Sequence, residues 1–115
     1  MKEYDLEERT YLFAKNVRNF LRKLPDCLEN IEDSKQLIRA SGSVGANYIE
    51  ANGALGKRDF IMRIRISRKE AKESRYFLRL MNPGDDISLQ SEQTELIQEA
   101  KELSCILGAI LKKVE

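Results

Sequence analysis

Positively charged side chains gather in one stretch of the sequence, between Lys57 and Arg79. This stretch holds nine basic and three acidic residues, a balance of +6, although the formal charge of the whole chain is only +1. Arginine binds phosphate through a planar fork of donors, and lysine binds it as a point charge. Residues of these types at short intervals could therefore bind the phosphate backbone of RNA or DNA without reading its sequence.

Eight of these cations fall on one flank of a helix when each residue is advanced by about 100° around the axis. They form a continuous row, which we call the basic stripe: Lys57, Arg58, Arg65, Arg68, Lys69, Lys72, Arg75 and Arg79. Asp59, Arg63, Glu70 and Glu73 fall on the other flank. The row predicts a nucleic-acid-binding surface, but it also fits a solvated face, or a face paired with acidic groups of the same or a neighbouring subunit. The near-zero net charge and the absence of tryptophan count against the first interpretation.

The residue types that carry most enzyme chemistry are missing. The chain has no histidine, which removes the commonest general base, the commonest metal ligand and the usual activator of a serine or cysteine nucleophile. Cys27 and Cys105 lack the spacing of a structural zinc site, so we expect both to be reduced thiols. The segment from Gly53 to Arg58 has too few residues between its glycines for a phosphate loop. We therefore predict that the protein is not an enzyme and holds no metal or other cofactor.

Apolar residues at alternating steps of three and four predict four amphipathic helices. The first runs from Leu6 to Leu24, where Pro25 ends it. The second is expected to have Asp33 or Ser34 as its N-cap. Each helix should therefore turn one apolar face toward a common core.

The last two predicted helices are bounded by turn residues. A turn over 52–56 precedes the third helix, which Pro83 and Gly84 stop. The candidate caps of the fourth helix are Asp85, Asp86, Ser88 and Ser91. Four helices joined by short turns, without strand-like alternation, predict an all-α antiparallel up-down-up-down four-helix bundle that forms a single domain over residues 1–115.

The second predicted helix carries two features besides its apolar face. Gly42 and Gly45 each cost about 1 kcal/mol relative to alanine within a helix, so they indicate either a close approach of another helix or local flexibility. Ser43, Asn47 and Glu50 recur at steps of four and three, away from the apolar line, and form a polar seam. The seam could fix the register of an oligomer interface by hydrogen bonds, or it could face water.

The sequence also predicts where the protein resides. The longest uncharged stretch spans only 40–49, well short of the roughly 20 apolar residues that cross a bilayer. The first eight residues are acidic and lack the apolar core of an export signal. We therefore predict a cytoplasmic protein with no membrane partner.

Several motifs resemble those of one protein family. The matching residues are Ser43, Val44, Asn47 and Glu50, then Arg58, Asp59 and Phe60, then Glu73 and Ser74. This pattern, within 36–80, is similar to that of the bacterial four-helix-bundle proteins encoded in intervening sequences of 23S ribosomal RNA genes. The glycine that usually follows the motif glutamate is replaced by Ala51 and delayed to Gly53.

The resemblance implies a ring-like homopentamer with no enzymatic activity. It also relates the chain to accessory proteins of diversity-generating retroelements, which are basic pentameric barrels that bind nucleic acid and a reverse transcriptase. The expected partners are accordingly further copies of this chain, RNA or DNA, and a reverse-transcriptase-like or other protein. Our leading hypothesis is a non-catalytic oligomer that binds nucleic-acid backbone through the basic stripe. The alternative is a protein-interaction scaffold whose charged helices pair between subunits.

Overall fold

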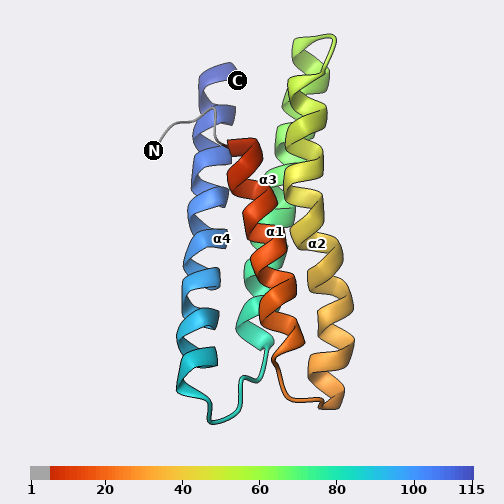
Figure 1. Cartoon of the computed structure of the whole chain (residues 1–115). Helices are drawn as coiled ribbons and strands as arrows, with labels where there is room; N and C mark the ends of the chain where they lie inside the picture. The colour runs from red at the N-terminus through yellow and green to blue at the C-terminus, as the bar shows by residue number, and fades with distance from the viewer. Residues whose placement is uncertain (1–5) are drawn as a thin grey trace.

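Four helices and three short connections make up the part of the chain that the computed structural model describes, residues 6–115. The helices are α1 (Leu6–Arg22), α2 (Leu28–Asn52), α3 (Lys57–Leu80) and α4 (Ile87–Val114). They run alternately up and down, with the α2–α3 turn at one end of the molecule and the other two connections at the opposite end (Figure 1). Each helix packs against its neighbours in sequence, and α4 returns to α1. The predicted all-α antiparallel four-helix bundle is confirmed.

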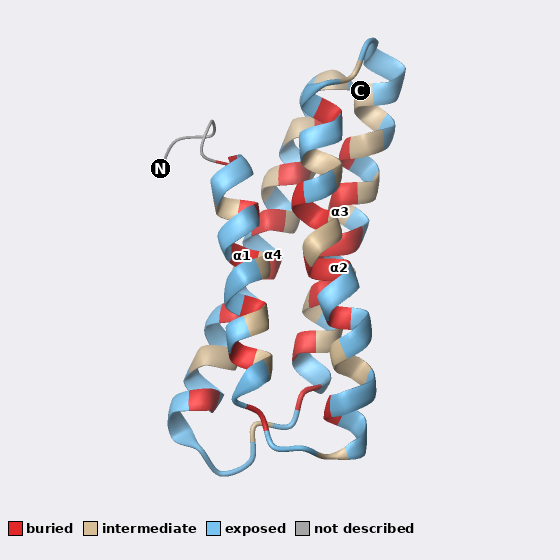
Figure 2. Ribbon diagram, turned by 45° about the vertical axis from the view of Figure 1, so that its right-hand side comes forward, coloured by how far each residue is buried: buried red, intermediate tan, exposed pale blue. Residues whose placement is uncertain are grey.

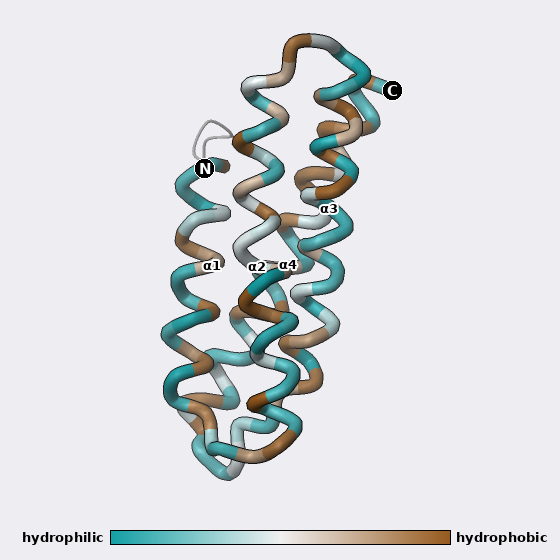
Figure 3. Tube along the Cα trace, turned by 90° about the vertical axis from the view of Figure 1, so that its right-hand side faces the viewer, coloured by the Kyte–Doolittle hydropathy of each residue, from teal (hydrophilic) through white to brown (hydrophobic). Residues whose placement is uncertain are grey.

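The apolar faces predicted from the sequence meet along the axis of the bundle. The eight largest fully buried side chains are Phe13, Phe20, Leu6, Leu37, Ile64, Leu78, Leu103 and Leu107. Those that share a helix are four, seven or fourteen residues apart, which places them on one face, and the buried positions recur along the inner sides of the helices while the outer sides are exposed (Figure 2). Hydrophobic and hydrophilic segments accordingly alternate along each helix (Figure 3). Because burying one such side chain stabilises the fold by about 1.5–3 kcal/mol, the core determines how each helix is rotated.

The connection between α1 and α2 differs from the prediction at one end. α1 ends at Arg22, two residues before the predicted end at Leu24, and Pro25 follows as expected. α2 begins at Leu28, so the prediction that Asp33 or Ser34 caps this helix was wrong. The helix is more than one turn longer at its start than its apolar pattern indicated.

The buried side chain of Asn30 explains this longer start. Its amide nitrogen donates to the carbonyl oxygens of Pro25 at 3.0 Å and Asn82 at 2.8 Å, and its side-chain oxygen accepts from the backbone N–H of Asn82 at 2.9 Å. Leu28 and Ile31 in the same turns stay exposed, so no apolar periodicity marked them as helical. The side chain of Asn30 thus links the α1–α2 connection to the α3–α4 connection and holds the first turns of α2 in place.

The close approach of α1 to α2 accounts for the glycines of α2. A β-carbon at Gly45 would lie 2.8 Å from Oγ1 of Thr10, which is closer than side-chain atoms pack. A β-carbon at Gly42 would lie 3.3 Å from a guanidinium nitrogen of Arg18, whose side chain donates to the carbonyl oxygen of Ile38 at 3.2 Å. The interpretation of these glycines as a helix-helix contact is confirmed.

The connection between α3 and α4 uses the turn residues that the sequence indicated. α3 ends at Leu80, ahead of Pro83, and Gly84 adopts a positive φ of 69°, which only glycine enters without strain. Asp86 is the N-cap of α4, because its carboxylate accepts a hydrogen bond from the backbone N–H of Leu89 at 3.1 Å. Asp86 is therefore the cap among the four candidates.

The four helix pairs are packed unequally. α3 has extensive contacts with both α2 and α4, whereas the contact between α1 and α4 is the least extensive. Ion pairs bridge that weaker boundary: Arg9 lies 2.7 Å from Glu99 and 2.8 Å from Glu102, and Lys23 lies 2.7 Å from Glu92. The basic stripe thus belongs to the helix that has the most extensive contacts with its neighbours.

Three further expectations concern residues outside the core. Cys27, before α2, and Cys105, on α4, are free thiols, as expected. Within 6–115, no helix combines the length and the apolar character that a membrane span requires. Residues 1–5, which contributed to the prediction that the chain lacks an export signal, lie outside the described residues.

Candidate nucleic-acid interface

The basic stripe faces outward because the inner side of α3 is anchored in the core. The fully buried residues of that inner side are Ile64, Ser67, Ala71, Ser74 and Leu78. Ser67 is also fastened to α2, since its hydroxyl donates to the carbonyl oxygen of Val44 at 2.7 Å. In the stripe Lys57, Arg58, Arg65, Lys69, Lys72 and Arg79 are exposed, and Arg68 and Arg75 are half-buried. The fold therefore presents all eight predicted cations away from the inner face of a single helix.

Most of the stripe has no anionic partner within residues 6–115. Arg65 is the exception, and its guanidinium donates to the side-chain carboxylate of Glu115, with Nε at 3.0 Å from Oε2. Both side chains are largely exposed, and an exposed ion pair contributes only about 0–1 kcal/mol. A phosphate group could displace Glu115 at little cost, so the six exposed cations of the stripe are open to an anionic ligand.

A hollow in the groove between α3 and α4 concentrates the positive charge. Its volume is about 410 Å³, and its lining residues are Arg65, Arg68, Lys69, Lys72, Leu111 and Glu115. Arg68 lies against Gly108 of α4, because a β-carbon at that glycine would be 3.3 Å from the Arg68 Nε. This Nε is buried and lacks a hydrogen-bond partner among the described residues. The hollow therefore brings four cations and the carboxylate of Glu115 together around one space.

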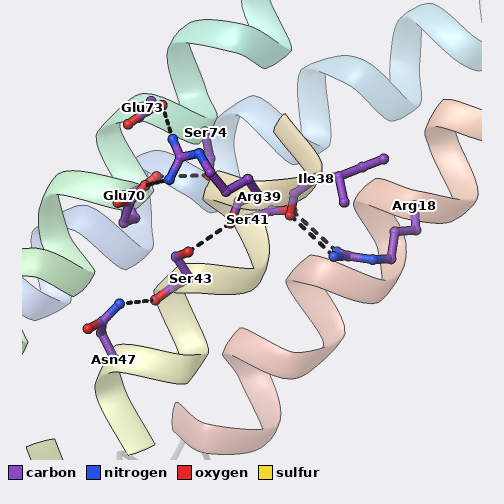
Figure 4. Close-up of polar contacts among 9 residues, drawn as sticks. All are labelled: Arg18, Ile38, Arg39, Ser41, Ser43, Asn47, Glu70, Glu73 and Ser74. Carbon is purple, nitrogen blue, oxygen red and sulfur yellow. Dashed lines mark hydrogen bonds and ion pairs between the residues drawn. The ribbon is translucent and has the colours of Figure 1, made fainter. Parts of the chain in front are cut away.

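Paired charges occupy the flank of α3 that faces α2 (Figure 4). Arg39 of α2 donates to Oε1 of Glu70 at 3.2 Å and, through its other terminal nitrogen, to the carboxylate of Glu73. The hydrogen bond to Glu73 and the charge of Glu70 raise the pKa of the Arg39 guanidinium above its ordinary value. Two of the three acidic residues between Lys57 and Arg79 thus share one cation from α2.

The polar seam lies on α2 beside this network. Ser43 donates its hydroxyl to the carbonyl oxygen of Arg39 at 2.8 Å. Asn47 donates to the carbonyl oxygen of Ser43 at 2.9 Å (Figure 4). The Oδ1 of Asn47 accepts a hydrogen bond from Nη1 of Arg63 at 3.2 Å. Glu50 is exposed. Two members of the seam therefore contribute to contacts within the chain, and its role at an oligomer interface stays a prediction.

Sequence reasoning missed the residues that make the two flanks of α3 different. Arg39 lies on another helix, 31 positions before Glu70, and no spacing in the sequence linked the two residues. Gly108 was one glycine in an amphipathic helix. An arginine and a glycine are common in helices, so their contacts with α3 can be predicted only when the register between neighbouring helices is known.

The stripe and the seam lie in the segment whose motifs suggested a family. The sequence model of the 23S rRNA-intervening sequence protein family matches residues 2–109. The chain belongs to this family. The family resemblance inferred from the motifs is confirmed, whereas kinship of this family member with retroelement accessory proteins stays a prediction.

A solved structure has the same fold as this member of the family. It is the crystal structure of a protein with unknown function from the S23 ribosomal protein family of Bacteroides thetaiotaomicron. The two chains are 28% identical, the match covers 93% of this chain and 98% of that chain, and the TM-score is 0.78. A search of curated proteins found no match. The agreement extends over nearly the full length of both chains and supports the four-helix arrangement described above.

Proposed function

We propose that this family member is a non-catalytic protein that binds the phosphate backbone of RNA or DNA through the basic stripe. One observation carries the proposal: within residues 6–115, seven of the eight stripe cations lack a carboxylate partner, whereas Glu70 and Glu73 of the same helix both pair with Arg39. From Lys57 to Arg79 the stripe is about 33 Å long at about 1.5 Å per residue, long enough to contact several phosphates of one nucleic-acid strand.

The residue types of the stripe suit contact with phosphate groups. The stripe combines the planar donor forks of arginine with the point charges of lysine, and both bind phosphate oxygens. Contacts of this kind position a nucleic acid and release its counterions but carry little sequence information. The expected ligand is therefore a class of polymer and not one sequence.

We propose further that the protein assembles with copies of itself, as its resemblance to ring-like pentamers implies. Repeating the stripe around an assembly would let one nucleic acid contact several copies, which raises the overall affinity without new kinds of contact. Light scattering at tens of micromolar protein should give a mass larger than that of one chain. A strict monomer would contradict this part of the proposal.

A salt titration of nucleic-acid binding tests the stripe. Replacing Lys69, Lys72 and Arg79 together by alanine removes three exposed cations and leaves the half-buried arginines in place. Each lost phosphate contact removes about 0.7–0.9 from the slope of log affinity against log salt, so the slope should fall by about 2–3. Mobility shifts with a mixed panel of RNA and DNA measure both affinity and slope.

The matched control removes the same charge from other helices. Lys15, Arg22 and Lys35 are exposed cations of α1 and α2, and their triple alanine variant should bind like the wild type. An equal loss of affinity in the two triple variants would show that net charge matters and the stripe does not. Absence of wild-type binding at low salt would refute the nucleic-acid proposal and favour the scaffold.

The scaffold alternative requires acidic surfaces that can pair with the stripe of another subunit. Between Gly84 and Glu115 the chain has seven acidic residues. Four of them already pair within the chain, namely Glu92, Glu99, Glu102 and Glu115. The remaining three are Asp85, Asp86 and Glu95, and further exposed carboxylates lie outside this segment, among them Glu8, Glu29 and Glu50. Acidic surfaces for the scaffold alternative therefore exist, and nucleic-acid binding at low salt is the measurement that decides between the two functions.

A further inference from the structure

An exposed aromatic ring lies inside the basic stripe. Tyr76 is 57% exposed, although most large apolar side chains of α3 are turned inward. On the helix it lies one turn after Lys72 and one turn before Arg79, and both of these cations are exposed. Residues three or four apart on a helix have β-carbons about 5–6 Å apart, so the ring is bordered on two sides by phosphate-binding side chains.

The position of the Tyr76 ring is set by the fold. Its centroid lies 5.3 Å from that of Phe77, and the two rings meet edge to face at 80°. Phe77 in turn packs against the hydrophobic core. Leu80, one turn after Tyr76, is 45% exposed and extends the apolar surface beside the ring. The ring is thus supported from the core side and open to solvent on the other.

We propose that Tyr76 is a stacking platform for an unpaired base, and that the basic stripe therefore prefers single-stranded nucleic acid. The inference rests on the proposed function, because the stripe must first bind the backbone. Bases within a duplex are stacked on one another, whereas bases of a single strand can turn out onto an aromatic ring while cations neutralise the neighbouring phosphates. Every base has a π-face, so the selection is for strandedness and not for sequence.

The charges around the ring favour a nucleic acid over a protein as the occupant. Lysine is depleted in the cores of protein interfaces. A protein surface that covered Tyr76 would also have to remove water from Lys72 and Arg79, which is costly without partner carboxylates. A polymer that alternates phosphates with flat bases matches the alternation of cations and ring.

Three variants separate stacking from charge. Tyr76→Ala removes the ring, Tyr76→Phe keeps it, and Tyr11→Ala removes a ring of similar exposure, 54%, from α1. Fluorescence anisotropy measures their affinity for a labelled single-stranded RNA, for the duplex of that strand, and for an abasic strand of equal length. We expect Tyr76→Ala to weaken single-strand binding by about 5- to 150-fold and to change duplex and abasic binding by less than about twofold. The other two variants should bind like the wild type.

Tyrosine emission gives a second measurement of stacking. The chain has four tyrosines and no tryptophan, so its intrinsic fluorescence reports on few rings. A base stacked on a tyrosine quenches its emission. The single strand should therefore quench the wild type more than Tyr76→Phe, even though both bind it.

Each other outcome has a defined meaning. If Tyr76→Ala loses no affinity, or loses it equally for strand and duplex, the stacking inference is overturned. The proposed function survives that result if duplex binding still depends on Lys69, Lys72 and Arg79, and it fails if the wild type binds neither ligand. A changed solution mass of Tyr76→Ala in light scattering would identify the ring as a contact between copies of the chain, which also overturns the inference.

Discussion

The two flanks of α3 differ in what the neighbouring helix supplies. Toward α2, the carboxylates of Glu70 and Glu73 meet the guanidinium of Arg39. Toward α4, Arg68 lies against Gly108, and Arg65 forms an ion pair with the side-chain carboxylate of Glu115. Both flanks are highly charged, yet the carboxylates of Glu70 and Glu73 are paired inside the fold, whereas most cations of the stripe are not. The comparison teaches that a charged helix face becomes a binding surface only where the adjacent helix leaves it without counter-charges.

This comparison assigns different properties to the two flanks. Glu70 is only 7% exposed, so its carboxylate depends on Arg39 for neutralisation. Lys69 and Lys72 are exposed and unpaired within the described residues, so the fold does not depend on them. Changes on the α2 side should therefore affect stability, and changes on the α4 side should affect binding.

The largest change in stability is expected from Arg39→Ala. The substitution leaves Glu70 and Glu73 without their cation, and because Arg39 is half exposed the free energy of unfolding should fall by about 1–2 kcal/mol. Urea denaturation measures this loss, and nucleic-acid affinity should stay unchanged. Lys69→Ala is the matched control and should lower affinity while changing stability by less than about 0.5 kcal/mol. If both variants changed stability, or both changed affinity, the two flanks of α3 would not have the different roles assigned to them.

A smaller effect is expected from Gly108→Ala, which alters the α4 side without touching a charge. The new β-carbon would lie 3.3 Å from Nε and 3.4 Å from Cζ of Arg68, so the guanidinium must shift. Alanine favours the helix by up to about 1 kcal/mol, and displacement of the half-buried Arg68 side chain offsets this gain, so stability should change by less than about 1 kcal/mol. Affinity for nucleic acid should fall by about threefold, or about 0.6 kcal/mol. Gly42→Ala places a β-carbon at the same 3.3 Å from Arg18, and unchanged binding of that variant would sharpen the contrast.

The smallest effect concerns the pH dependence of the α1–α4 boundary. Hydrogen bonds from Gln98 and Arg9 lower the pKa of Glu102 below its ordinary value. Such a carboxylate contributes stability that is complete above its unfolded-state pKa and is lost as the pH falls through the lower, folded-state pKa. Between neutral and acid pH the melting temperature of the wild type should therefore fall slightly more than that of Glu102→Gln. Glu95→Gln, which alters an exposed carboxylate of α4, should follow the wild type.

Most of the fold could be predicted from local patterns. The faces that contain Phe13, Leu37, Ile64 and Leu103 repeat with helical spacing, and this repeat survives in any packing of the helices. The start of α2 could not be predicted in this way. Its first turns are held by Asn30, whose partners include Asn82, 52 positions away.

The candidate site was predicted only in part. The row from Lys57 to Arg79 follows from helical spacing, which needs no knowledge of other helices. The contact of Arg65 with Glu115, and the support of the Tyr76 ring on a Phe77 that is itself packed on the core, require the positions of side chains in space. Periodicity can say which residues share a face, but it cannot say what lies opposite that face.

By itself, the amino-acid sequence determined the helices, their buried faces and the clustering of cations on α3, because residues at steps of three and four share one side of a helix whatever surrounds it. Only the tertiary structure decided which of those charges are free. The partner of Glu70 comes from another helix, and whether Arg39 reaches it depends on the register and rotation of two packed helices, which no local spacing specifies.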